Sequence, residues 1–134
     1  MKIDGYEKLF NTYLDSNIFN QLVLLSPKTL SNEHKLEILD SLAYRLQIEF
    51  QKTVVFITNK KHNSEVDVFD NSQPTAELPL IYSKNKDVVF LVDIDTPYFD
   101  DRLSWEDKIV ELLIYYKYPA FGFMSGCQKI KIYE

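Results

Sequence analysis

The stretch Val88-Val-Phe-Leu-Val-Asp-Ile-Asp95 runs from five consecutive apolar residues into two aspartates. A short run of β-branched and aromatic residues of this kind predicts a buried strand. The strand leads into an acidic segment, residues 93–107, which holds six carboxylates and one arginine. The net charge of this segment, −5, equals that of the whole chain. The chemistry of the aspartates that follow the strand therefore decides what function the sequence predicts.

The length and composition predict one folded domain. The chain has 134 residues, of which 46% are hydrophobic and 26% are charged, as is ordinary for a globular protein. We therefore expect a single domain over residues 1–134. No run approaches the roughly 18 apolar residues of a membrane span, and residues 1–8 lack the apolar core of a signal peptide. The single cysteine, Cys127, excludes an internal disulfide, so we predict a cytoplasmic protein that does not enter the membrane.

The charge is negative and unevenly distributed. A net charge of −5 argues against nucleic acid as a main partner, because phosphate backbones are bound by clustered lysine and arginine. Residues 65–111 carry twelve acids and four bases, whereas the rest of the chain carries eight acids and eleven bases. A patch of one sign speeds the encounter with an oppositely charged molecule. We therefore expect a basic protein as the partner.

The hydrophobic periodicity predicts helices at the start of the chain and strands in the middle. Apolar residues recur at helical spacing over 6–18, in a helix expected to end before Pro27, and again over 31–50, where Ser31 suits a helix N-cap. A third helix is expected from Ser104, where Ser104-Trp-Glu-Asp107 matches a capping box, to Pro119. Apolar or alternating runs predict strands over 53–58, 65–69, 78–82, 88–92, 120–123 and 128–133.

The order of these elements favours an α+β fold. The helices are grouped rather than alternating with strands, and residues 83–87 suit a hairpin turn. We therefore predict a mainly antiparallel sheet of five or six strands. The two N-terminal helices and the later helix are expected to pack on one face of this sheet.

The segment Asp93-Ile-Asp-Thr96 is one candidate for chemistry. It resembles the first motif of haloacid-dehalogenase-type phosphotransferases, in which the first aspartate is a nucleophile and the second an acid or base. That motif belongs to the first strand of a doubly wound domain. Only 39 residues follow Asp95, too few to complete such a domain, so the resemblance does not carry an assignment.

Asp93 and Asp95 are also candidates for a simpler metal site. An EF-hand loop is excluded, because Tyr98 stands where that loop needs glycine. A metal-dependent hydrolase or phosphotransferase that used this pair would also need a lysine or histidine nearby. Only Arg102 and Lys108 are close in sequence, and His34 and His62 are expected to be exposed.

The aromatic residues of the acidic segment favour protein binding instead. Rings among carboxylates are typical of interface hot spots, although Phe99 and Trp105 also suit a core. An acidic loop can occupy a cationic cleft by presenting carboxylates in place of phosphates. The predicted partner-binding residues are Asp93, Asp95, Tyr98, Phe99, Asp100, Asp101 and Asp107.

We therefore predict a small acidic protein-binding module without catalytic activity, cofactor or metal. Its most specific form is an inhibitor of the immunity or antitoxin type that docks on a basic toxin or nuclease domain. Two alternatives remain open. One is a small metal-dependent hydrolase or phosphotransferase that uses Asp93 and Asp95. The other is a homo-oligomeric structural module whose exposed edge strands pair between subunits.

Overall fold

The computed structural model describes residues 4–15, 22–25, 30–58, 60, 67–69, 77–95 and 105–125. Its elements are α1 (Asp4–Asp15), β1 (Leu22–Leu25), α2 (Asn32–Ile48), β2 (Thr53–Thr58), β3 (Asp67–Phe69), α3 (Glu77–Lys84), β4 (Val88–Asp95), α4 (Trp105–Tyr116) and β5 (Ala120–Ser125). The five described strands form one sheet in the order β1-β5-β4-β2-β3, and every neighbouring pair is parallel. The prediction of a mainly antiparallel sheet is therefore wrong.

Two segments contribute to this error. Residues 78–82, predicted as a strand, lie in α3, so a helix rather than a hairpin leads into β4. Pro79 is tolerated in the first turn of a helix, where its missing N–H costs no intrahelical bond, but it is unfavourable inside a sheet. Residues 22–25, for which no strand was predicted, form β1. Parallel strands are joined by crossover connections rather than by hairpins, and α3 before β4 and α2 after β1 are such connections.

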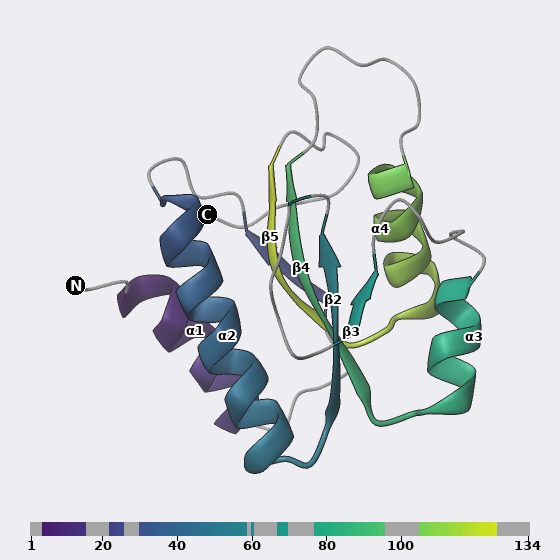
Figure 1. Cartoon of the computed structure of the whole chain (residues 1–134), viewed down its shortest axis with the longest axis horizontal. Coiled ribbons are helices and arrows are strands. Elements are labelled where there is room, and N and C mark those ends of the chain that lie inside the picture. The colour runs from purple at the N-terminus through teal and green to yellow at the C-terminus, as the bar shows by residue number, and fades with distance from the viewer. Residues whose placement is uncertain are drawn as a thin grey trace.

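Helices cover both faces of the sheet, which corrects the prediction that they pack on one face (Figure 1). α1 and α2 lie on one side, and α3 and α4 lie on the other. A separate hydrophobic cluster fills each interface. On the α1/α2 side, the ring of Phe10 lies 6.1 Å from that of Phe121 and 5.8 Å from that of Phe123, between centroids. On the other side, Ile109 and Leu113 of α4 are buried in the second cluster.

Burial on both faces explains the composition of the central strands. A strand that is covered on both sides needs apolar side chains at successive positions rather than at alternate ones. β4 meets this requirement, since its first seven residues are all buried. The last five residues of β2 are buried as well. Continuous apolar runs over 54–57 and 88–92 are thus the sequence signal of this parallel sheet.

Other predicted elements are present with shifted ends. α1, α2 and α4 correspond to the three predicted helices, and β2 to β5 correspond to four predicted strands. The predicted N-cap of α2 is confirmed, because the hydroxyl of Ser31 accepts a hydrogen bond from the backbone N–H of His34 at 3.2 Å. The predicted cap at Ser104 and the predicted strand over 128–133 lie outside the described residues.

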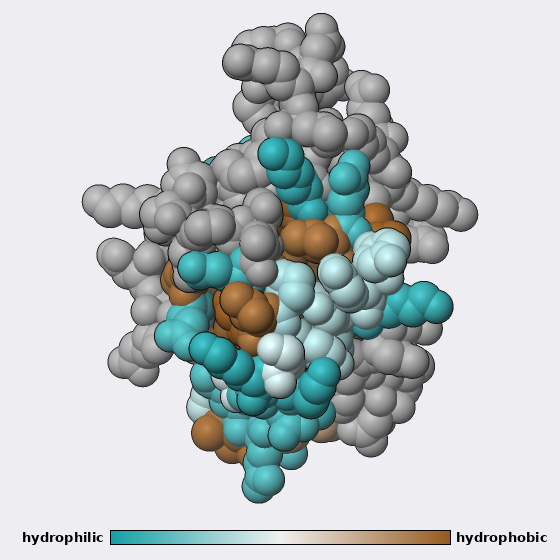
Figure 2. All heavy atoms as spheres, turned by 90° about the vertical axis from the view of Figure 1, so that its right-hand side faces the viewer, coloured by the Kyte–Doolittle hydropathy of each residue, from teal (hydrophilic) through white to brown (hydrophobic). Residues whose placement is uncertain are grey.

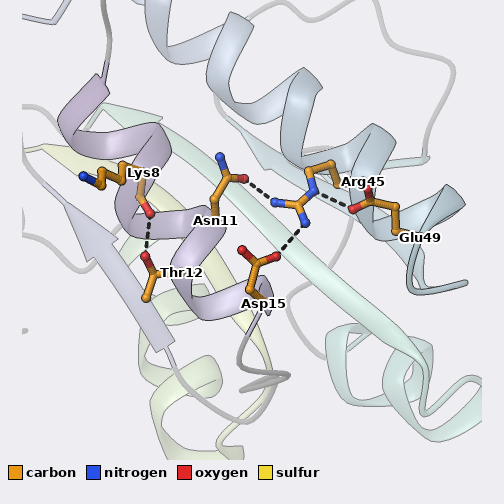
Figure 3. Close-up of polar contacts among 6 residues, drawn as sticks. All are labelled: Lys8, Asn11, Thr12, Asp15, Arg45 and Glu49. Carbon is orange, nitrogen blue, oxygen red and sulfur yellow. Dashed lines mark hydrogen bonds and ion pairs between the residues drawn. The ribbon is translucent and has the colours of Figure 1, made fainter.

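A polar network ties α1 to α2 beside their hydrophobic contact (Figure 3). Arg45 of α2 donates hydrogen bonds to Asn11 at 2.7 Å and to Asp15 at 2.8 Å, both on α1. It also donates to Glu49, just after α2, at 2.6 Å. The hydrogen bonds to Asp15 and then to Glu49 raise the pKa of Arg45. Because both carboxylates are more than half exposed, solvent screening limits each ion pair to less than about 1 kcal/mol, so the network orients α1 more than it stabilises the fold.

None of the described helices is suited to crossing a bilayer. α2, the longest, has 17 residues and carries charged side chains from Glu33 to Arg45. A spanning helix needs about 20 predominantly apolar residues.

Gly122 brings β5 close against β4. Its φ of 154° is one that other residues rarely adopt, and a Cβ at this position would clash with the carbonyl oxygen of Val92. Val92 and Gly122 are register partners in the parallel pair of β4 and β5. The clash would be with backbone that the sheet holds in place, so no rotation of a side chain can relieve it.

Replacing Gly122 by alanine should therefore destabilise the fold strongly. For Gly122→Ala we expect the free energy of unfolding, measured by urea denaturation, to fall by about 3 kcal/mol. Ala120→Gly on the same strand is the matched control, because it removes a buried methyl group and should cost only about 1.5 kcal/mol. A Gly122→Ala variant as stable as the wild type would contradict the close approach of the two strands.

Candidate functional site

Polar side chains gather at the carboxyl edge of the sheet, on the side covered by α2. Side chains of a strand alternate between the two faces, and Val89 and Leu91 of β4 belong to the α1/α2 cluster. Asp93 and Asp95 continue the same side at the end of β4. Thr58, the last residue of β2, is the register partner of Asp93. The side chains of Thr58, Asp93 and Asp95 therefore share one face of the sheet near the start of α2.

Lys60 joins these residues into one cluster. Its Nζ lies 2.7 Å from Oδ1 of Asp93 and 3.3 Å from Oδ2 of Asp95. The same ammonium donates a hydrogen bond to Oδ1 of Asn32 at 3.0 Å. One lysine, two residues beyond β2, thus bridges both carboxylates of β4 and the first residue of α2.

Local hydrogen bonds position Lys60 over the end of β2. Its backbone N–H donates to Oγ1 of Thr58 at 3.0 Å, a contact that turns the chain directly after the strand. Thr58 is itself fully buried, so this anchor is fixed by the packing around it. The N-cap of α2, Ser31, precedes Asn32, which sets the start of the helix beside the cluster.

The three charged groups differ in their exposure to solvent. The side chain of Asp93 is 5% exposed and that of Lys60 is 19% exposed, whereas that of Asp95 is 47% exposed. Removing an ion from water costs several kcal/mol, and a buried carboxylate is therefore stable only beside a cation or strong donors. Asp93 and Lys60 form this kind of buried pair, and Asp95 extends it towards solvent.

The structure describes the side chains of two of the seven predicted partner-binding residues. It brings Asp93 and Asp95 together at the end of β4, and the burial of Asp93 leaves its carboxylate in contact with Lys60. The side chain of Asp107 and residues 98–101, which are Tyr98, Phe99, Asp100 and Asp101, lie outside the described part of the chain. Their role in docking stays a prediction.

Sequence reasoning missed the lysine at the centre of the site. Residues 59–63 form a polar segment without a motif, and Lys60 is 33 residues away from Asp93 in the chain. Lys60 could have been found only from the strand topology, because the carboxyl ends of neighbouring parallel strands meet at one edge of a sheet. Treating 53–58 and 88–92 as parallel neighbours would have placed residue 60 beside residues 93 and 95.

Two carboxylates and a lysine in this arrangement suit a divalent cation and a phosphate group. The ammonium of Lys60 contacts both Asp93 and Asp95, so a cation that took its place would face an oxygen of each carboxylate. Among the described residues, no three or more His, Cys, Asp or Glu side chains are grouped so as to hold a metal ion. Mg²⁺ fits a set of two carboxylates, because it commonly completes its shell with water and substrate phosphate.

The chain matches no protein-family model, no curated protein and no solved structure. The geometry and charge of the site therefore carry the functional proposal.

A second exposed feature lies on the α3/α4 side of the molecule, where pale and brown side chains interrupt the teal surface (Figure 2). Ring centroids are 4.2 Å apart for Tyr82 and Tyr118, and 5.3 Å apart for Tyr116 and Tyr118. Burial raises the pKa of Tyr118, and the neighbouring rings of Tyr116 and Tyr82 add to the shift. The ring centroids of Tyr115 and Tyr116 are 4.9 Å apart, and Tyr115 is 78% exposed. The tyrosines therefore form a row of neighbouring rings from the buried Tyr118 to the surface.

Removing Lys60 should leave a buried charge without its partner. In Lys60→Met the carboxylate of Asp93 loses its cation, and we expect the free energy of unfolding to fall by roughly 3 kcal/mol in urea denaturation. The double variant Lys60→Met/Asp93→Asn also removes the carboxylate charge, and it should recover most of this loss. Equal stability of the single and double variants would show that the ion pair does not hold Asp93 in the fold.

Proposed function

We propose that Asp93, Asp95 and Lys60 form the active site of a small metal-dependent hydrolase or phosphotransferase that acts on phosphate esters. The observation that carries the proposal is the position of the Lys60 ammonium within 3.3 Å of both carboxylates. A lysine beside the aspartate pair is the group that the local sequence lacks, since only Arg102 and Lys108 are near in the chain. The fold supplies it from just beyond the end of the neighbouring strand, β2.

Each residue has a role that follows from its position. Asp93 and Asp95 hold the divalent cation at the end of β4, and water and substrate oxygens complete the coordination shell. Lys60, displaced from the carboxylates by the cation, binds phosphate oxygens as a point charge. Negative charge that develops on the phosphate during transfer is thus met by two fixed positive charges.

The place of the cluster in the fold supports the proposal independently. In open parallel sheets, ligands bind outside the carboxyl ends of the strands, where connections depart towards opposite faces. α2 follows β1 and covers one face, whereas α4 follows β4 and covers the other. The cluster joins the end of β4 to the start of α2, and so it lies at the carboxyl edge of the parallel sheet, where such ligands bind.

The charge balance restricts the class of substrate. The chain carries a net charge of −5, and the two aspartates of the cluster outnumber its one bridging lysine. A nucleic acid, with a phosphate at every nucleotide, is repelled by such a surface. A small phosphate ester brings few charges and arrives with its metal ion, so it is the better fit.

Calorimetric titration of the full chain with Mg²⁺, Mn²⁺ and Ca²⁺ tests the metal site. We expect one Mg²⁺ or Mn²⁺ per chain, and we expect Asp93→Asn and Asp95→Asn each to abolish binding because each removes a charged ligand. Asp87→Asn is the matched control. Asp87 is exposed and immediately precedes β4, at the opposite end of the strand, so its loss should leave binding unchanged.

Metal-dependent hydrolysis of p-nitrophenyl phosphate completes this test. Turnover is expected in the wild type and in Asp87→Asn, and it should disappear in both site variants. If none of the three ions binds, or if the control loses binding to the same extent, the metal site is refuted.

A second candidate function is protein binding, and one observation favours it. Ile114, Tyr115 and Tyr116 expose apolar surface on α4, and aromatic residues are enriched in protein interfaces. We propose on this basis that an inhibitor of the immunity or antitoxin type would dock on a basic toxin or nuclease domain through α4 and the acidic segment over 93–107. The tyrosines would supply the apolar anchors of such an interface, and the carboxylates would supply its charge.

Affinity capture with variants of the exposed tyrosines tests this second candidate. The double variant Tyr115→Ser/Tyr116→Ser should lose a basic protein that the wild-type chain retains, as identified by mass spectrometry. Tyr44→Ser is the control, because Tyr44 is 65% exposed on α2, on the other side of the sheet. Equal recovery of the same protein by all three chains would exclude the α4 surface.

A further inference from the structure

Lys35 is a charged residue that the fold buries without a side-chain partner in the described part of the chain. It is the fourth residue of α2 and only 7% exposed. Among the described residues, no side chain or carbonyl accepts a hydrogen bond from its ammonium, and no carboxylate lies within 4 Å of it. Burying an ammonium without an acceptor is unfavourable, so such a group points to a ligand.

The position of Lys35 on α2 directs its side chain towards the candidate site. It shares the buried stripe of α2 with Ile38, Leu39 and Leu42, and these residues pack against the sheet. Helical side chains lean towards the N-terminus of their helix. We therefore expect the long side chain of Lys35 to extend from the sheet-facing stripe towards the first turn of α2, where Asn32 contacts Lys60.

The first turn of α2 offers donors in the same place. The N–H of His34 is satisfied by the hydroxyl of Ser31, but the N–H groups of Asn32 and Glu33 have no acceptor among the described residues. Free amides at a helix N-terminus attract anions, because the helix dipole is positive there. Together with Lys35, they form a donor set for a multiply charged anion.

We propose that Lys35 and the first turn of α2 bind the dianionic phosphate of a phosphomonoester. This inference rests on the proposed function only in naming the substrate class, because the anion site itself needs no metal. A terminal phosphate offers two charges and three acceptor oxygens, which match one ammonium and two backbone amides. A phosphodiester has one charge fewer and is disfavoured at such a site.

Phosphate titration of the ¹⁵N-labelled full chain, without metal and at constant ionic strength, tests the proposal. We expect inorganic phosphate to shift the backbone amide resonances of residues 32–35 along a saturable curve and to leave those of α4 in place. Dimethyl phosphate, a monoanion, should bind at least roughly tenfold more weakly. No shift of the 32–35 amides with inorganic phosphate would overturn the inference, even if no variant could be prepared.

Variants of the lysine provide the second arm of the test. Lys35→Met should weaken phosphate binding by roughly tenfold or more, whereas Lys35→Arg, which keeps the charge, should largely retain it. Lys108→Met is the matched control, since Lys108 is the fourth residue of α4 and is exposed. Equal weakening in Lys35→Met and Lys108→Met would overturn the site. Phosphate binding through Lys35 in a chain that binds no metal would refute the metal-dependent function and leave this anion site standing.

Discussion

β4 is buried on both faces, and the described helices and strands are arranged to satisfy that constraint. A strand with no polar side must be covered by helices on both faces and paired along both edges. α1 and α2 cover one side, α3 and α4 cover the other, and β2 and β5 occupy the two edges. Because helical crossovers make neighbouring strands parallel, their carboxyl ends meet at one edge of the sheet. The place where charged groups converge is thus a consequence of how the core is covered.

At that edge, buried apolar side chains are followed directly by charged ones. Val92 is fully buried, and the next residue, Asp93, is a buried carboxylate that contacts Lys60. Stability alone does not explain this choice, because a well-packed apolar pair of similar volume is often at least as stable as a buried ion pair. Asp93 and Lys35, which has no side-chain partner among the described residues, are both unfavourable groups for a core, and they lie at the same end of α2 and β4. Two charged groups that are unfavourable to bury, at one place in the fold, favour a binding role for the site.

Local features were predictable from the sequence, and features set by strand pairing were not. The N-cap at Ser31 depends only on adjoining residues. The acidic end of β4 is equally local, because Asp93 directly follows the apolar run in the sequence. The short apolar stretch over 78–82 was ambiguous, because periodicity over five residues does not separate a strand from a buried helical turn. Assigning it to a strand led to the prediction of an antiparallel sheet. In such a sheet the carboxyl ends of β2 and β4 are not expected to lie side by side. Lys60 could not be found on that basis, since its contact with Asp93 exists only in the parallel register of β2 and β4.

The location of Asp93 on a central strand also bears on how the site moves. Its neighbours on both sides belong to paired strands, with Thr58 on β2 and Phe123 on β5 in register with it. Backbone in the middle of a sheet opens to hydrogen exchange only in the rarest and largest fluctuations, close to global unfolding. The backbone that carries Asp93 is therefore held as firmly as the central strands of the sheet. Among the described residues, any opening or closing of the site must therefore come from the longer side chains that reach it, Lys60 above all.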